Sequence, residues 1–501
     1  MRILVFRIFL FIFLGLTLFL YVTFIRRLIL KKQSQSLNII LISIDTLRAD
    51  HMGIYGYKKD TTPNIDKWAK NATVFTNANT VVPMTYPSFV ALMTGQDPLK
   101  TRITNNSLLS SPKPWEPWVN ALPLSDNIKT LPKILKEKGY FNVAFMSTPA
   151  LNDKSNINKG FDLYVNFNLR NDIAKASVST ALDLLDKNKN KKIFFWIHLL
   201  DPHSPYTPPE DLKCKFNPKY CNLKGTDQSL EIERNSYVQQ LTKDCNSYNT
   251  IPQDKKEIFK MLYDGEIALS DGLVKMILDK LSEIGLDKNS LIVLYGDHGE
   301  GFDHEVYFEH GPNVYQSNIR TPLIIKYPLT KATDIRVNRL VQNIDIFPTL
   351  LDLLGISTKD KVDGKSFSDI FYGDIFSIFN FNKRKDAYSI NSSMTKFSIV
   401  NDNYKYIYNY KTCAYKNYNE ELYDLDKDSE EMSNIVDSKK DIATKLNKKL
   451  MNYLSRYNLP QDYNRQNLNY INGVVSEPAS LIPIPTSTSN KEIEQLKSLG
   501  Y

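Results

Sequence analysis

The sequence predicts an α/β protein with a mostly parallel central sheet flanked by helices, a small C-terminal α+β subdomain and an N-terminal transmembrane helix. Short, nearly continuous apolar runs alternate along the chain with segments of helical periodicity, which predicts parallel strands connected by helices. These runs do not alternate apolar with polar residues, which is typical of strands that are buried on both faces. The transmembrane helix is predicted from an uncharged apolar run near the N-terminus.

The composition is that of a globular protein and excludes several other classes. Of the 501 residues, 42% are hydrophobic and 24% are charged, which excludes disordered, collagen-like and coiled-coil chains. The formal net charge is +8, but residues 1–36 hold six Arg and Lys and no acid. The rest of the chain carries 57 basic against 55 acidic residues. Such a nearly neutral body argues against a nucleic-acid partner.

The apolar run at residues 8–25 is long enough to cross roughly 27 Å of bilayer at about 1.5 Å per residue. A cleaved signal peptide is the competing interpretation, but the run is long for such a peptide and no small-residue cleavage site follows it. We therefore assign residues 1–33 to a membrane anchor. Basic residues flank the run on both sides, so charge alone does not set its orientation.

The predicted elements follow in order along the chain. Strands are predicted at residues 37–44, 141–145, 192–199, 291–295 and 323–326. Helices are predicted at residues 64–69, 131–138, 173–185, 257–284 and 344–354. We assign residues 34–375 to a catalytic domain built on these elements and residues 376–501 to the C-terminal subdomain.

The C-terminal subdomain is predicted to contain a small antiparallel sheet and a helical tail. Residues 397–400 and 404–408 have the pattern of short strands joined by a turn. A helix is predicted at 442–457, and a final short helix after a proline-rich span. Two stretches rich in Pro, Asn and Ser, 107–123 and 205–252, are predicted to be insertions that cover a site.

The four cysteines, at 214, 221, 245 and 413, fit no zinc or redox spacing. Their even number allows two disulfides if the chain is tethered in an oxidising compartment. A Cys214–Cys221 bond would close a short loop. Four unpaired thiols are the alternative.

Acidic and histidine side chains follow two of the predicted strands. Asp45 ends the first strand, and Asp297 and His298 follow the strand at 291–295. Ligands bind beyond the carboxyl ends of strands in open parallel sheets, so these side chains are candidates for holding one metal ion. A helix cap at Asp45 and a hydrogen-bonded turn at Asp297 are the structural alternatives.

Thr85 precedes Pro87 and an apolar helical run, so it is expected at a helix N-terminus, where anions are favoured. Its hydroxyl is a candidate nucleophile or a simple cap. Three of the six histidines lie within residues 297–310. His203 and His310 are the candidates for contact with substrate, whereas His198 is expected to point into the core.

Together these segments resemble the sulfatase-like branch of the alkaline phosphatase superfamily, over about residues 37–501. The motifs occur in the family's order: ILISIDTLRADHMGIYGY, TTPNID, TYPSFVALMTG, HLLDPHSPY, YGDHGEGF, HGPNVYQSNIRTPLIIKYP, QNIDIFPTLLDLLGI, ELYDLDKDSEEMSNI and the terminal LKSLGY. The resemblance implies that the fold is alkaline-phosphatase/sulfatase-like. It also implies metal ligands at Asp45, Thr85, Asp297 and His298, and catalytic residues at Thr85, His203 and His310.

The chain departs from sulfatases at the nucleophile. Sulfatases have Cys or Ser in a C/S-x-P-S-R segment and convert it to formylglycine, whereas this segment reads Thr85-Tyr-Pro-Ser-Phe89. A second Asp often follows the first strand in the family, but Thr46 stands here. The pattern resembles the threonine-nucleophile members, among them phosphoethanolamine and phosphoglycerol transferases.

We therefore expect a membrane-anchored metalloenzyme that cleaves or transfers phosphate or sulfate esters, of a lipid or a glycan, through Thr85. A genuine sulfatase and a catalytically silent binding protein of the same fold are the alternatives. Two Asp, one His and a hydroxyl suit one divalent ion, with Zn²⁺ or Mn²⁺ favoured over Mg²⁺ or Ca²⁺. The resemblance implies a single-pass protein of the cytoplasmic (inner) membrane with its catalytic domain outside the cytoplasm.

Overall fold

The computed structural model describes residues 2–106, 122–166, 172–221, 227–243, 251–304, 306–330, 334–358, 360–372, 383–401, 403–409 and 419–457. Most of the predicted insertion at 107–123 lies outside these residues. The same holds for the proline-rich span and the final short helix predicted after residue 457, and for Cys245 and Cys413.

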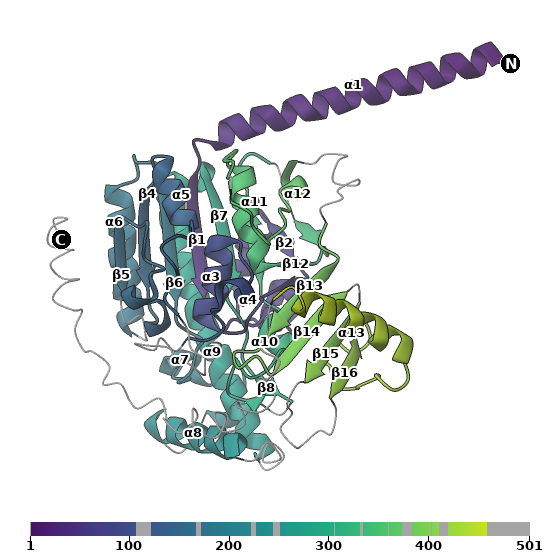
Figure 1. The fold of residues 1–501 in the computed structure, drawn as a ribbon. Helices are drawn as coiled ribbons and strands as arrows, with labels where there is room; N and C mark the ends of the chain where they lie inside the picture. Colours follow the sequence, from purple (N-terminus) through teal and green to yellow (C-terminus); the bar gives the residue numbers. More distant parts are fainter. Residues whose placement is uncertain are drawn as a thin grey trace.

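A central eight-stranded sheet organises the protein (Figure 1), in the order β11-β2-β10-β7-β1-β6-β4-β5. Its middle strands are β1 (Asn38–Ile44), β6 (Ile193–Leu199), β7 (Ser290–Gly296) and β4 (Phe141–Met146), all mutually parallel. The sequence predicted each of them as a continuous apolar run, and every residue of β1, β6 and β7 is buried. The predicted mostly parallel sheet is confirmed.

The sheet edges hold strands that the apolar pattern did not single out. These are β2 (Thr73–Phe75), β5 (Leu163–Asn166) and β11 (Ile335–Val337). The predicted strand β10 (Leu323–Lys326) has the expected bounds but runs antiparallel to both its neighbours, β2 and β7. The pattern of an apolar run carries no strand direction, so this reversal was not predicted.

Helices cover both faces of the sheet and bury alternate residues of each strand. Ile40, Ile42 and Ile44 face a core shared with α2 (Pro63–Ala69), α6 (Asp172–Lys187) and α9 (Gln253–Glu283). Ile39 and Leu41 face the opposite core, shared with α3 (Thr85–Thr94), α5 (Leu131–Glu137) and α11 (Ile346–Leu353). Burial on both sides is why the middle strands contain so few polar residues.

The C-terminal part forms a second, antiparallel sheet of β13 (Asp386–Ile390), β14 (Lys396–Asn401), β15 (Tyr404–Asn409) and β16 (Glu420–Asp424). Helix α13 (Lys440–Leu454) packs on it through Ala443, Leu446 and Leu450. The predicted hairpin corresponds to β14 and β15, and the predicted helix corresponds to α13.

Helix α1 (Arg2–Ser34) extends from the body at the edge where β1 begins (Figure 1). Its last turns contact the body: Leu30 is buried, and Lys31 forms an ion pair with Asp352 at 3.1 Å. Elsewhere, the stretch 205–252 contains α7 (Glu210–Lys213) and α8 (Asp227–Lys243). Cys214 and Cys221 form the predicted short disulfide loop.

Candidate metal centre and active site

The carboxyl ends of two adjacent strands place the acidic candidates together. β1 and β7 are parallel neighbours, and Ile44 is paired with Gly296. Asp45 and Asp297, the next residue on each chain segment, therefore leave the sheet at the same level. Both are fully buried, as is His298. Helix α3 starts nearby with Thr85, which is 1% exposed.

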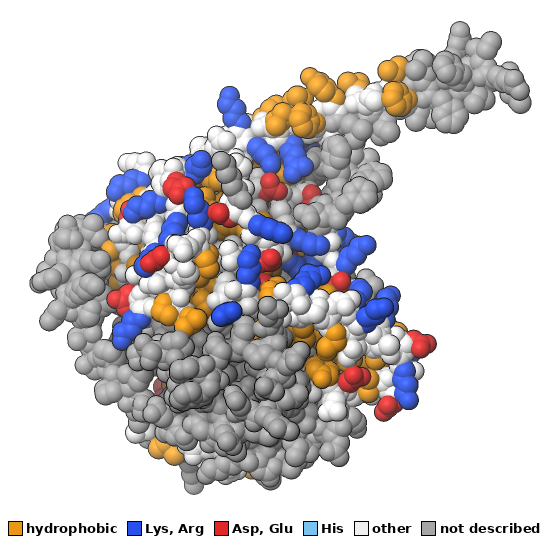
Figure 2. Space-filling view, in the orientation of Figure 1, with side chains coloured by type: hydrophobic (Ala, Val, Ile, Leu, Met, Phe, Trp, Pro, Cys, Tyr) orange, Lys and Arg blue, Asp and Glu red, His pale blue; other side chains and the backbone are white. Residues whose placement is uncertain are grey.

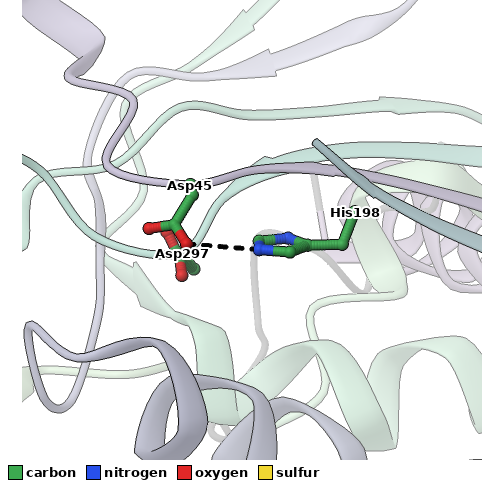
Figure 3. A group of neighbouring side chains, drawn as sticks. All are labelled: Asp45, His198 and Asp297. Atoms are coloured by element: carbon green, nitrogen blue, oxygen red, sulfur yellow. Dashed lines mark hydrogen bonds and ion pairs between the residues drawn. The ribbon is translucent and has the colours of Figure 1, made fainter. Parts of the chain in front are cut away.

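In each carboxylate, protein groups hold one oxygen and leave the other without a hydrogen-bond partner among the described residues. Asp297 Oδ1 accepts hydrogen bonds from the backbone N–H groups of Thr46 (3.1 Å) and His298 (2.8 Å). Asp45 Oδ2 lies 3.3 Å from His198 Nε2 (Figure 3). The oxygens without partners are Asp45 Oδ1 and Asp297 Oδ2.

Both of these oxygens face the same nitrogen. Asp45 Oδ1 lies 3.6 Å and Asp297 Oδ2 lies 3.5 Å from His298 Nε2. The Nδ1–H of His298 donates to the carbonyl of Gly299 at 3.0 Å, which leaves a lone pair on Nε2. Thr85 Oγ1 is 3.4 Å from that Nε2.

This spacing fits a single divalent ion. Four ligands held about 2.1 Å from an ion in a tetrahedron lie about 3.4 Å apart, and the three distances from His298 Nε2 are 3.4, 3.5 and 3.6 Å. Two buried carboxylate oxygens without partners are costly unless a cation neutralises them. The residues present therefore fit a metal site at Asp45, Thr85, Asp297 and His298.

The electrostatics of the cluster favour binding of a cation. Burial and the neighbouring Asp45 carboxylate raise the pKa of Asp297 well above its ordinary value. Burial also raises the pKa of Asp45, but the hydrogen bond from His198 and the surrounding histidines outweigh it, so the net pKa is lowered. Burial, followed by the charge of His310, lowers the pKa of His298 to about 3. His298 is therefore neutral near pH 7, as a metal ligand must be.

Two further histidines border the cluster. The ring of His310 lies 4.4 Å from that of His298 and 5.0 Å from that of His203, measured between centroids. His310 Nδ1 lies 3.3 Å from Glu300 Oε1. Burial lowers the pKa of His310, but the Glu300 carboxylate outweighs it and raises the pKa to about 9. His310 therefore carries a proton at neutral pH.

The structure brings together all six residues singled out in the sequence, namely Asp45, Thr85, His203, Asp297, His298 and His310. It also adds three that sequence reasoning missed. Glu300 raises the pKa of His310, and His198 contacts Asp45. Asn106 donates a hydrogen bond from Nδ2 to Thr85 Oγ1 at 3.5 Å. The YGDHGEGF motif contains Glu300, so its position was available in the sequence, but its partner was not. His304 lies elsewhere, stacked on Tyr315.

Asn106 is oriented by a second hydrogen bond. Its Oδ1 accepts from the backbone N–H of Tyr86 at 2.8 Å, which fixes the amide so that Nδ2 faces Thr85. This amide therefore presents an N–H donor to the Thr85 hydroxyl. Such donors stabilise an anionic group attached there.

Comparisons with known proteins identify the family of the chain. A family model described as Sulfatase matches residues 37–356, and one described as N-sulphoglucosamine sulphohydrolase, C-terminal, matches residues 304–457. An ulvan-active sulfatase of Formosa agariphila is 24% identical over 66% of this chain and 64% of its own length. A Delta 4,5-hexuronate-2-O-sulfatase of Bacteroides thetaiotaomicron is 25% identical over 80% of this chain and 84% of its own.

The fold also matches solved structures. The phosphonate monoester hydrolase of Agrobacterium radiobacter superposes with a TM-score of 0.66, at 18% identity, over 84% of this chain and 96% of that one. At this identity the similarity concerns the fold.

Proposed function

The chain belongs to the sulfatase family, and from that premise we propose that it is a divalent-metal-dependent ester hydrolase that uses unmodified Thr85 as its nucleophile. The observation that carries the proposal is the convergence of Thr85 Oγ1, Asp45 Oδ1 and Asp297 Oδ2 on His298 Nε2, at 3.4–3.6 Å. A silent binding protein would not need two buried carboxylate oxygens that lack hydrogen-bond partners among the described residues, because each costs stability.

Thr85 Oγ attacks the sulfur or phosphorus of the ester in line, and the bond from that atom to the leaving alcohol oxygen breaks. A divalent cation bound at the cluster would supply a Lewis acid that stabilises the alkoxide form of Thr85. His310 gives its proton to the departing oxygen, so the alcohol leaves neutral. The Nδ2–H group of Asn106 holds a non-bridging oxygen of the group on Thr85.

The second step restores the enzyme. Water attacks the Thr85 ester and gives a proton to His310, which was left neutral by the first step. The bond to Thr85 Oγ breaks and inorganic sulfate or phosphate is released. We propose that His203 contacts the substrate beside His310; its Nδ1 contacts the carbonyl oxygen of Ser204 at 2.7 Å, and its ring lies 5.0 Å from that of His310 between centroids.

For the substrate, we infer a sulfate ester of a glycan. The names of the relatives, an ulvan-active sulfatase and a hexuronate sulfatase, support sulfate and favour the sulfatase alternative over a phosphotransferase. A phosphate ester is the second candidate, because Thr85 stands where sulfatases carry Cys or Ser. Zn²⁺ or Mn²⁺ suits two carboxylates, one imidazole and one hydroxyl.

The test is turnover of matched aryl sulfate, aryl phosphate and aryl phosphodiester by the purified chain. We expect activity that needs an added divalent ion, is lost in Thr85→Ala and is retained in part by Thr85→Ser, which keeps a hydroxyl. Thr85→Cys is a further variant to assay, because it places at this position a residue type that sulfatases have there. Activity of Thr85→Ala equal to that of the wild-type chain would exclude Thr85 as nucleophile.

We also propose that α1 is retained as a membrane anchor. Apolar side chains are exposed on the helix where it extends from the body (Figure 2), and Phe13 and Leu18 are among the exposed residues. The segment Phe13–Ser34 is long and apolar enough to cross a membrane. The contacts of Leu30 and Lys31 with the body support retention over cleavage, because cleavage after the apolar run would leave this docked segment at a new terminus. The Cys214–Cys221 disulfide supports an extracytoplasmic body. The mass of the mature chain and its extraction from membranes at alkaline pH test this proposal.

A further inference from the structure

A chain of buried polar side chains runs from the interior of the sheet to Asp45. It begins at Trp196 on β6, crosses to Ser43 on β1, returns to His198 on β6 and ends at Asp45. All four side chains are fully buried. Ser43 and His198 are directly paired between the two strands, which places their side chains side by side.

The chemistry of these groups determines the direction of each hydrogen bond. The Nε1–H of Trp196 is only a donor, so Ser43 Oγ accepts from it at 2.9 Å. The single hydroxyl proton of Ser43 then has His198 Nδ1 as its nearest acceptor, at 2.9 Å, whereas the carbonyl of Ile197 is 3.4 Å away. With the hydroxyl proton on this shorter contact, Nδ1 of His198 is an acceptor and the ring N–H that faces Asp45 is on Nε2.

That proton points at Asp45. The Nε2–H of His198 donates to Asp45 Oδ2 at 3.3 Å (Figure 3). Asp45 Oδ1 is left 3.6 Å from His298 Nε2. By distance alone His198 could itself be a metal ligand, because its ring and the carboxylates of Asp45 and Asp297 each offer an atom within 4.8 Å of the others. The hydrogen bonds argue against this, because both nitrogens of His198 are already engaged.

We propose that His198 is a positioning residue that orients the metal ligand Asp45, and that Ser43 and Trp196 select the tautomer of His198 that can do so. This inference rests on the proposed function, because it presupposes a divalent ion at Asp45. Removal of a residue that supports a metal ligand through a hydrogen bond typically lowers metal affinity 10–100-fold. His298, with its free Nε2, supplies the imidazole ligand.

The test measures binding of Zn²⁺ and Co²⁺ to the purified full chain, by competition with a chelating dye. Ser43→Ala removes the hydroxyl that selects the tautomer and is expected to weaken Zn²⁺ binding about 10–100-fold. His198→Gln places an amide N–H near the position of Nε2 and is expected to stay within a few-fold of wild type. The visible spectrum of bound Co²⁺ should be unchanged in both variants, because the ligands are the same.

Ser147→Ala is the matched control. Ser147 Oγ–H donates to the backbone carbonyl of His198 at 2.6 Å, so this variant removes a buried hydroxyl next to the same residue without touching its ring. It should leave Zn²⁺ affinity unchanged. Thermal unfolding of the metal-free variants separates loss of the fold from loss of binding.

Two results would overturn the inference. Zn²⁺ affinity of Ser43→Ala equal to that of wild type would mean that the tautomer is irrelevant. Loss of binding by His198→Gln, with an altered Co²⁺ spectrum, would mean that His198 is itself a ligand. Failure of the wild-type chain to bind either ion would instead refute the metal-dependent function on which the inference rests.

Discussion

The Glu300–His310 pair makes a sharp prediction about pH. The proposed mechanism needs His310 protonated, and Glu300 raises the pKa of this buried histidine to about 9. Glu300→Gln keeps the size of the side chain and removes its charge, so burial then dominates. We expect the pKa of His310 to fall to its ordinary value, about 6.5, or below.

The expected size of the effect follows from the protonated fraction of His310. At pH 8 a group with a pKa of about 9 is roughly 90% protonated, whereas one at about 6.5 is roughly 3% protonated. Activity of Glu300→Gln at pH 8 should therefore be about 30-fold below wild type, and the two should converge toward pH 5.5. A bound cation lowers both pKa values by electrostatic repulsion, so the separation between the two profiles is the quantity to measure.

The assay is kcat/KM against pH, from pH 5 to 10, with a saturating divalent ion. Glu309→Gln is the matched control, because Glu309 precedes His310 in the chain and raises the pKa of His310 less than Glu300 does. A smaller shift is expected for it. Parallel pH profiles for Glu300→Gln and wild type, offset by a constant factor, would refute His310 as the proton donor.

The next predictions concern stability and metal binding. Lys405 and Glu431 form an ion pair at 2.7 Å, with side chains 0% and 1% exposed. Lys405→Met leaves the Glu431 carboxylate buried without its partner and should lower the free energy of unfolding by about 3–5 kcal/mol. The double variant with Glu431→Leu should recover much of that loss, as measured by denaturant unfolding. Gly272 lies in α9 with open space around it, so Gly272→Ala should stabilise the chain by about 0.5–1 kcal/mol. Gly299→Ala should instead abolish Zn²⁺ binding, because a Cβ there would meet the carbonyl oxygen of Ser317.

The sequence predicted the part of the fold that depends on burial on both faces. The strand at 323–326 has the predicted bounds, and the strand predicted at 192–199 differs by one residue. The direction of β10 was not predictable, because it depends on its neighbours rather than on its own residues. Helix α8 was missed because its residues are polar around most of the helix and show little periodicity.

At the site, strand ends were sufficient to find Asp45 and Asp297, because the carboxyl ends of parallel strands meet at one edge. The role of Glu300 was not predictable, because it depends on the chain folding back to bring His310 within 3.3 Å. His198 was expected to point into the core and is fully buried, but its contact with Asp45 was not predicted. Its ring is buried because the centre lies within the protein, directly beyond β1 and β6.

The charge balance of the site bears on sulfate against phosphate. Asp45 and Asp297 together balance one divalent ion, and Glu300 balances the charge on His310. Among the described residues, the nearby arginines are also paired: Arg48 with Asp50 and Asp303, and Arg234 with Glu231. The site therefore offers little net positive charge to a dianion.

A sulfate ester and a phosphodiester each carry one negative charge near pH 7, whereas a phosphate monoester carries nearly two, because its second pKa is near 6. We expect kcat/KM for the aryl sulfate or the aryl phosphodiester to exceed that for the aryl phosphate, and the opposite order would refute this charge argument.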